Sequence, residues 1–199
     1  MKLKDTSKIE PQKDRVLVDI KSKVKDQDGL YTGEDKSGNY IGEVVKLGPN
    51  ATEDLHCPNL KEGDLAIFSE FSGHHIATDN SIKLKVIPGY DIVATVSDQN
   101  NINEQTLTAT ADRVLISVRM TDESEDGLVI SAEEAKDPKL TDLDYGVILQ
   151  TGPVAKMGLQ VGQLVAYEPW CGVVVKQRKF TGDSELKLIR EDDILFIAG

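Results

Sequence analysis

The stretch Asp14-Arg15-Val16-Leu17-Val18 recurs almost unchanged as Asp112-Arg113-Val114-Leu115-Ile116, and this repetition decides the fold. Asp28-Gly29-Leu30-Tyr31 follows the first copy, and Asp126-Gly127-Leu128-Val129-Ile130 follows the second at the same spacing of 98 residues (127 − 29). Three further pairs of segments recur in the same order: 41–49 with 145–153, 61–68 with 160–167, and 83–94 with 186–196. Self-similarity at a fixed period indicates a duplicated unit. The sequence therefore predicts two copies of one domain in tandem.

Charge and composition argue against several classes of partner. The 199 residues include 23 basic and 34 acidic side chains, so the formal net charge is −11. No lysine or arginine cluster is present to neutralise phosphates, which argues against nucleic acid and anionic membranes. No stretch approaches the ~20 apolar residues that span a bilayer, and residues 1–7 lack the apolar run of a signal peptide. We therefore expect a soluble cytoplasmic protein.

Short runs of β-branched residues, bounded by turn residues, fill most of both repeats. Val16, Val18 and Ile20 alternate on one side of an extended segment, as expected for a strand. Further runs that end near glycine or proline turns lie at 42–47, 64–68, 82–87 and 90–96. No segment has a convincing helical period, and many short strands with regular turn signals favour small barrels. The predicted architecture is all-β, with one barrel at 1–96, a polar linker at 97–106 and a second barrel at 107–199.

Each repeat also contains one polar segment that lacks the residue pattern of a strand. These segments are 22–39 and 121–144, and each holds a small apolar island directly after a glycine. The first island is Leu30-Tyr31 after Gly29, and the second is Leu128-Val129-Ile130 after Gly127. An apolar tag on a flexible tether is typical of a binding device. The alternative interpretation is that the islands are ordinary strand residues of a core.

Taken together and in order, these motifs resemble the GroES (chaperonin-10) co-chaperonin family. The motifs are the Asp-Arg strand, the Gly-Leu-Val-Ile tag, Gly42-Glu43-Val44-Val45-Lys46-Leu47-Gly48, Glu62-Gly63-Asp64-Leu65-Ala66-Ile67-Phe68 and the terminal Asp193-Ile194-Leu195-Phe196-Ile197. The resemblance covers both repeats almost end to end. It implies two tandem GroES-like small β-barrels with flexible loops, assembled as a homo-oligomeric ring that caps the ATP-bound ring of a GroEL-like chaperonin.

The same resemblance implies the site residues. The chaperonin-binding set is Gly29, Leu30 and Tyr31 in repeat 1 and Gly127, Leu128, Val129 and Ile130 in repeat 2, with the glycines giving the turns their freedom. A lid of this kind has no catalytic residues and needs no cofactor. We therefore expect a binding protein rather than an enzyme, which supports protein folding during the ATP cycle of its partner.

Repeat 2 departs from the family pattern in two places. Six residues enter its tag loop, and it has 10 positions from Gly152 to Gly162 (162 − 152) where repeat 1 has 15 from Gly48 to Gly63 (63 − 48). The shorter stretch leaves little room for the roof hairpin of GroES. A longer loop with a reduced roof resembles phage-encoded co-chaperonins, for which the location would be the host cytoplasm.

Two other classes of function remain open from the sequence. A pair of such barrels suits a viral structural protein of a capsid or tail, with the apolar loops contacting neighbouring subunits. A barrel enzyme of the quinone-reductase type would need a dinucleotide-binding domain, and no Gly-x-Gly-x-x-Gly segment is present. Mutation of the second tag separates a lid, which would lose its chaperonin, from a structural protein, which would lose self-assembly.

The remaining cysteine, histidine and aromatic side chains give no sign of a metal site or a disulfide. Cys57 and Cys171 lie at unrelated positions of the two repeats, so reduced thiols are expected. His56, His74 and His75 lack the spacing of a metal site, so solvated loop histidines are expected and no metal is assigned. Phe71 and Trp170 follow equivalent strands, and each either lines the interior of an assembly or packs within its barrel. The sequence does not decide between these two.

Overall fold

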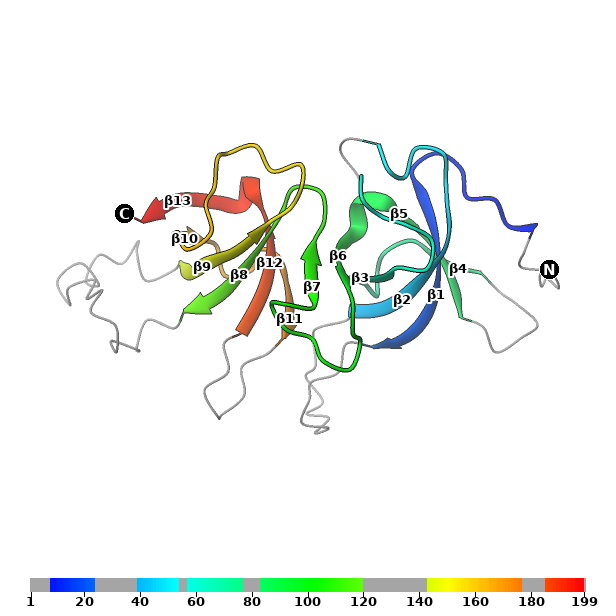
Figure 1. Cartoon of the computed structure of the whole chain (residues 1–199), viewed down its shortest axis with the longest axis horizontal. Coiled ribbons are helices and arrows are strands. Elements are labelled where there is room, and N and C mark those ends of the chain that lie inside the picture. Colours follow the sequence, from blue (N-terminus) through cyan, green and yellow to red (C-terminus); the bar gives the residue numbers. More distant parts are fainter. Residues whose placement is uncertain are drawn as a thin grey trace.

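The computed structural model describes residues 8–23, 39–53, 57–76, 83–119, 143–176 and 185–198 as two antiparallel sheets (Figure 1). The first sheet contains β1 (Arg15–Lys23), β2 (Asn39–Leu47), β3 (Leu65–Ser69), β4 (His74–Ile76), β5 (Leu84–Pro88), β6 (Ile92–Val96) and β7 (Leu107–Ala109). The second contains β8 (Arg113–Arg119), β9 (Asp144–Thr151), β10 (Leu164–Tyr167), β11 (Val173–Lys176), β12 (Glu185–Arg190) and β13 (Ile194–Ala198). The predicted all-β fold, built from two similar domains in tandem, is confirmed.

The order of the strands shows how closely the two sheets correspond. The first runs β4-β5-β1-β2-β3-β6-β7 and the second runs β11-β12-β8-β9-β10-β13. Short 3-10 turns, η2 (Gly89–Asp91) and η4 (Glu191–Asp193), precede the last strand of each repeat. Residues 90 and 91, expected at the start of a strand, therefore lie in a turn, and β6 begins at Ile92. No helix in the described ranges is long and apolar enough to cross a membrane.

Unusual backbone conformations confirm that the duplication is structural. Lys13 and Ala111, 98 residues apart, both precede the Asp-Arg strand with positive φ of 56° and 48°, a conformation uncommon outside glycine. Gly63 and Gly162 have φ of 90° and 91° at the turn into the third strand of each repeat. Because each turn fixes the direction of the strand that follows, the two repeats position their strands in the same way.

Each repeat has its own core, built from the alternating side chains of its strands. The repeat 1 core includes Val16, Val18, Val44, Phe68 and Ile87, and the repeat 2 core includes Val114, Ile116, Ile148, Tyr167 and Ile189, all fully or almost fully buried. Complete burial of a side chain of this size contributes about 1.5–3 kcal/mol. Leu17 and Leu115, which point away from these cores, are also 0% exposed. Both faces of the first strand in each repeat are therefore covered.

The shortened stretch of repeat 2 is held by a carboxylate. The Glu191 N–H donates to the Asp112 carbonyl, just as the Gly89 N–H donates to the Asp14 carbonyl in repeat 1. Glu191 Oε2 also accepts hydrogen bonds from the Lys156 and Met157 N–H groups at 2.6 and 3.0 Å. At the position of this carboxylate, repeat 1 has only a glycine. A side chain thus anchors the reduced roof segment predicted from the sequence.

The two repeats share a third core. Val93, Ala94 and Val96 of β6 cluster with Leu107 and Ala109 of β7, and the cluster continues into β8, β11 and β12. Strand β7 pairs with β6 and so adds to the sheet of repeat 1. It does so although its residues belong to the predicted second barrel at 107–199. The connection at 97–106, predicted to be a linker, forms hydrogen-bonded turns and buries Ile102 to 7% exposure. The domain boundaries themselves stay a prediction.

Candidate functional site

The seven predicted chaperonin-binding residues lie outside the described residues. They are Gly29, Leu30, Tyr31, Gly127, Leu128, Val129 and Ile130. The structure does describe the strands on either side of both tag segments: β1 and β2 flank 24–38, and β8 and β9 flank 120–142. These strand pairs fix where each tag segment leaves its domain, and the role of the tags stays a prediction.

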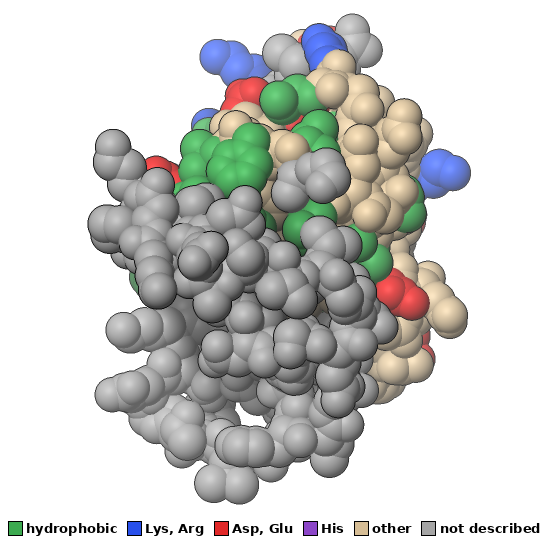
Figure 2. All heavy atoms as spheres, turned by 90° about the vertical axis from the view of Figure 1, so that its left-hand side faces the viewer, with side chains coloured by type: hydrophobic (Ala, Val, Ile, Leu, Met, Phe, Trp, Pro, Cys, Tyr) green, Lys and Arg blue, Asp and Glu red, His purple; other side chains and the backbone are tan. Residues whose placement is uncertain are grey.

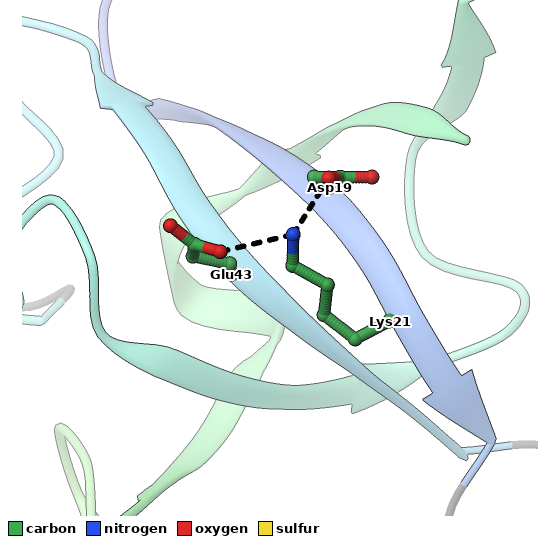
Figure 3. A network of polar contacts seen from close by, with 3 residues as sticks. All are labelled: Asp19, Lys21 and Glu43. Carbon is green, nitrogen blue, oxygen red and sulfur yellow. Dashed lines mark hydrogen bonds and ion pairs between the residues drawn. The ribbon is translucent and has the colours of Figure 1, made fainter. Parts of the chain in front are cut away.

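The strands at the base of the first tag segment carry a three-residue ion cluster (Figure 3). Lys21 Nζ on β1 lies 2.8 Å from Asp19 Oδ2 and 2.9 Å from Glu43 Oε2 of β2. Asp19 and Glu43 face each other across the two strands, so the ammonium separates two like charges. The hydrogen bonds to Asp19 and Glu43 raise the pKa of Lys21. The cluster links the two strands close to the point where the segment leaves.

The base of the second tag segment is built differently. Ser117 and Val147 pair across β8 and β9 where repeat 1 has the two carboxylates. Arg119 and Tyr145 form the last pair before the segment leaves, and the Tyr145 ring contacts Phe196 of β13 edge-on at a centroid distance of 6.4 Å. Both bases therefore carry an aromatic contact, since the Tyr40 and Phe68 ring centroids lie 6.2 Å apart in repeat 1, but the carboxylate pair bridged by a lysine is present at the base of repeat 1 and replaced by Ser117 and Val147 in repeat 2.

Two equivalent loops present exposed aromatic rings. Phe71 is 85% exposed and Trp170 is 74% exposed, on the turns that follow β3 and β10. Packing inside the barrels, one of the two interpretations of these residues, is therefore wrong. Gly73 and Gly172 close the two turns with positive φ, and a Cβ at either position would lie 2.0 or 2.4 Å from a carbonyl oxygen of the neighbouring strand.

A buried lysine anchors each aromatic loop. Lys85 Nζ donates to the Glu70 carbonyl, and Lys187 Nζ donates to the Pro169 carbonyl at 2.7 Å. The Lys187 ammonium also lies 4.7 Å from the ring centre of Tyr167, a cation–π contact. Burial lowers the pKa of both lysines. Sequence analysis missed this pair, although a lysine in the middle of an apolar strand at the same place in both repeats is a visible signal.

The described residues show no arrangement suited to metal or nucleophilic chemistry. No group of three His, Cys, Asp or Glu side chains in these ranges lies close enough to hold a metal ion. Burial raises the pKa of the Cys57 thiol to about 12, so the reactive thiolate is scarce at neutral pH. His74 and His75 are exposed on β4 rather than in a loop, and His56 lies outside the described residues.

Two domains with corresponding strand orders, turns and anchored loops define a duplicated β protein. The family model of the chaperonin 10 Kd subunit matches residues 8–96 and again residues 106–198. The chain belongs to the chaperonin 10 family, in tandem, as the sequence motifs predicted. It is similar to the co-chaperonin GroES of Hydrogenovibrio crunogenus (strain DSM 25203 / XCL-2), with 33% identity over 93 residues, which cover 44% of this chain and 97% of the relative.

Proposed function

We propose that the protein is a co-chaperonin that caps a GroEL-like chaperonin ring and supports ATP-dependent protein folding. The observation that carries this proposal is the double match to the chaperonin 10 family over nearly the whole chain. The family is one of co-chaperonins rather than of enzymes. We place the protein in the cytoplasm, either of a bacterium or of the host of a phage, and assign the capping contact to the apolar tags.

Weak individual contacts suit a cap that must also be released. Burial of a Leu, Val or Ile side chain contributes roughly 1.5–3 kcal/mol, whereas each loop residue that becomes ordered costs about 1–2 kcal/mol. One tag therefore binds weakly. Several tags on one assembly gain roughly 10²-fold or more in avidity through effective concentration. The loss of a few contacts during the ATP cycle then releases the cap.

Co-elution with a GroEL-type chaperonin on size exclusion tests the proposal. We expect binding that depends on ATP and is lost in the double variant Leu128→Asp with Ile130→Asp. The matched control is Met157→Asp with Val161→Asp, because these apolar side chains are 54% and 68% exposed on repeat 2 but lie outside the tag. Circular dichroism checks that both double variants remain folded.

The outcomes distinguish the candidate functions. Capture that is lost in the tag variant and retained in the control supports a cap anchored by the second tag. Capture that survives both variants places the contact elsewhere on the chain. No binding with any nucleotide overturns the proposal and favours the structural alternative, a capsid or tail component whose self-assembly the tag variant would then impair. The equivalent variant Leu30→Asp with Tyr31→Asp measures the share of repeat 1.

A further inference from the structure

The strand that follows the first tag segment is tied to the other repeat. Asn39 is the first residue of β2 and comes directly after residues 24–38. Its Nδ2 donates a hydrogen bond to the Val174 carbonyl oxygen of β11 at 3.2 Å. Among the described strands, β11 is the outer strand of the second sheet. The point at which the first tag segment re-enters repeat 1 is therefore anchored on repeat 2.

Burial gives this hydrogen bond its weight. Asn39 is only 6% exposed. A buried amide that loses its partner carries the full cost of its removal from water, whereas an exposed amide exchanges one partner for another. The contact with Val174 therefore favours one position of the Asn39 side chain and, with it, one position of the start of β2.

The next residues of β2 alternate between the two repeats. Residues two apart on a strand lie on the same face of the sheet. Ile41, two residues after Asn39, is 1% exposed and belongs to the shared core together with Val175 of β11. Tyr40 packs instead against the core of its own repeat, with its ring centroid 6.2 Å from that of Phe68. The start of β2 is thus held by one polar and one apolar contact to repeat 2.

Repeat 2 lacks this anchor at the base of its own tag segment. Leu143 stands where repeat 1 has Asn39, because Tyr40 and Asp144 pair with equivalent residues of the two third strands. A leucine side chain has no hydrogen-bond donor. The ring of Tyr145 contacts the last strand of its own repeat, and Figure 2, which faces that end of repeat 2, shows hydrophobic side chains gathered on its surface. The amide anchor is therefore a property of the first tag segment.

A fixed end changes what a tag segment loses on binding. The ordering of chain residues opposes binding, and a segment that is held in place beforehand binds more tightly because less ordering remains. Coupling between two events is reciprocal, so a ligand that holds the start of β2 also stabilises its contact with β11. The anchor thus connects the first tag segment to the joint between the repeats.

We propose that Asn39 is a positioning residue that couples binding at the first tag to the joint between the two repeats. The amide fixes the start of β2 on β11, so the first tag binds a chaperonin more tightly while the repeats are joined at this contact. The coupling deepens the proposed function and rests on it for the identity of the ligand. The anchor between β2 and β11 does not rest on that function.

A double-mutant cycle tests whether Asn39 acts through the first tag. The variant Asn39→Leu gives repeat 1 the residue that repeat 2 has at this place. We expect it to raise the dissociation constant for a GroEL-type chaperonin with ATP by about two- to tenfold, the effect of one lost hydrogen bond. In the background Leu30→Asp with Tyr31→Asp, which disables the first tag, the same substitution should leave the dissociation constant unchanged.

Hydrogen exchange tests the anchor in the free protein, without chaperonin or nucleotide. In Asn39→Leu, exchange should become about two- to tenfold faster at residues 39–41 and at residues 173–175 together, while residues 143–145 keep their rates. The matched control is Asn50→Leu, because the Asn50 side chain bonds Glu53 within repeat 1. This control should leave exchange at all three segments unchanged.

The two measurements separate the coupling from the proposed function. Equal weakening of capture in both backgrounds, or none in either, overturns the positioning role of Asn39. Unchanged exchange at residues 173–175 in Asn39→Leu overturns the anchor, even when the protein captures a chaperonin and the proposed function stands. If the unmodified protein captures no chaperonin, the proposed function fails and the coupling to binding fails with it, and joint acceleration at the two segments still supports the anchor.

Discussion

Lys187 Nζ donates a hydrogen bond to the Pro169 carbonyl oxygen at 2.7 Å, directly before the exposed ring of Trp170. Lys85 and Glu70 form the same contact before Phe71. A lysine that lies inside its sheet thus holds each aromatic loop at the surface. The contact joins the fifth strand of each repeat to the turn after the third.

We predict that Lys187→Met loosens the loop at Trp170 with little change in overall stability. The charged hydrogen bond is worth about 1.5–3 kcal/mol, but its loss is offset because an ammonium is no longer buried. The free energy of unfolding should therefore change by about 1 kcal/mol or less. Trp170 is the one tryptophan of the chain, so its fluorescence anisotropy should fall. Lys85→Met is the matched control, and a fall of equal size in that variant would contradict local anchoring.

Glu191→Ala should destabilise repeat 2 by about 1–3 kcal/mol, because the Lys156 and Met157 N–H groups lose a charged acceptor. Urea denaturation measures this cost, and faster hydrogen exchange at those two amides locates it. The neighbouring variant Asp192→Ala removes an exposed carboxylate and should change stability by less than about 0.5 kcal/mol. Equal losses of stability in the two variants would show that the removal of a negative charge, rather than the loss of this contact, destabilises the protein.

Lys21→Met should cost about 0.2–1 kcal/mol at neutral pH, the range for exposed ion pairs. The pKa of Lys21 is raised in the folded protein, so its stabilisation is complete below the unfolded value of about 10.4. It is lost as pH rises through the folded pKa. The stability difference between the two proteins should therefore be constant from pH 7 to 9 and shrink above about 10.4. Lys61→Met controls for the loss of an exposed lysine; a stability difference that stays constant above about pH 10.4 would contradict the assignment.

Gly172→Ala should be much more destabilising than Gly158→Ala. Both glycines have positive φ, at 77° and 69°, so both variants pay about 1–2 kcal/mol for the left-handed conformation. Only at Gly172 would the new Cβ lie 2.4 Å from the Leu188 carbonyl oxygen, whereas Gly158 has open space. The melting temperatures of the two variants, measured by thermal unfolding, separate the cost of the steric clash from the cost of the left-handed backbone conformation. Similar melting temperatures would show that β12 shifts freely to admit the methyl group.

The sequence predicted the fold because its strongest signals are local. Alternation at Val16 and Val18 and the repeated Asp-Arg motif indicate strands and their duplication, and β1, β8 and the paired turns at Lys13 and Ala111 confirm both. The contact between the repeats was not predictable in this way, because the pairing of Leu107 and Ala109 with β6 joins segments on opposite sides of the predicted linker.

The buried lysines and the exposed aromatic rings show a second limit. The sequence left open whether Phe71 and Trp170 pack in the core, yet each loop projects its ring outward while a lysine stem fills the interior. Hydrophobicity alone does not distinguish these two arrangements. The predicted tags at Leu30 and Leu128 remain predictions, because they lie outside the described residues.

Strand β7 joins β6 within each chain, so the two domains of a chain stand next to each other. Every closed cap assembled from whole chains then contains twice as many domains as chains, and that total is always even. A chaperonin ring with an odd number of sites cannot be matched one to one by such a cap. The numbers of domains and sites then differ, so at least one domain stays undocked or at least one site stays empty.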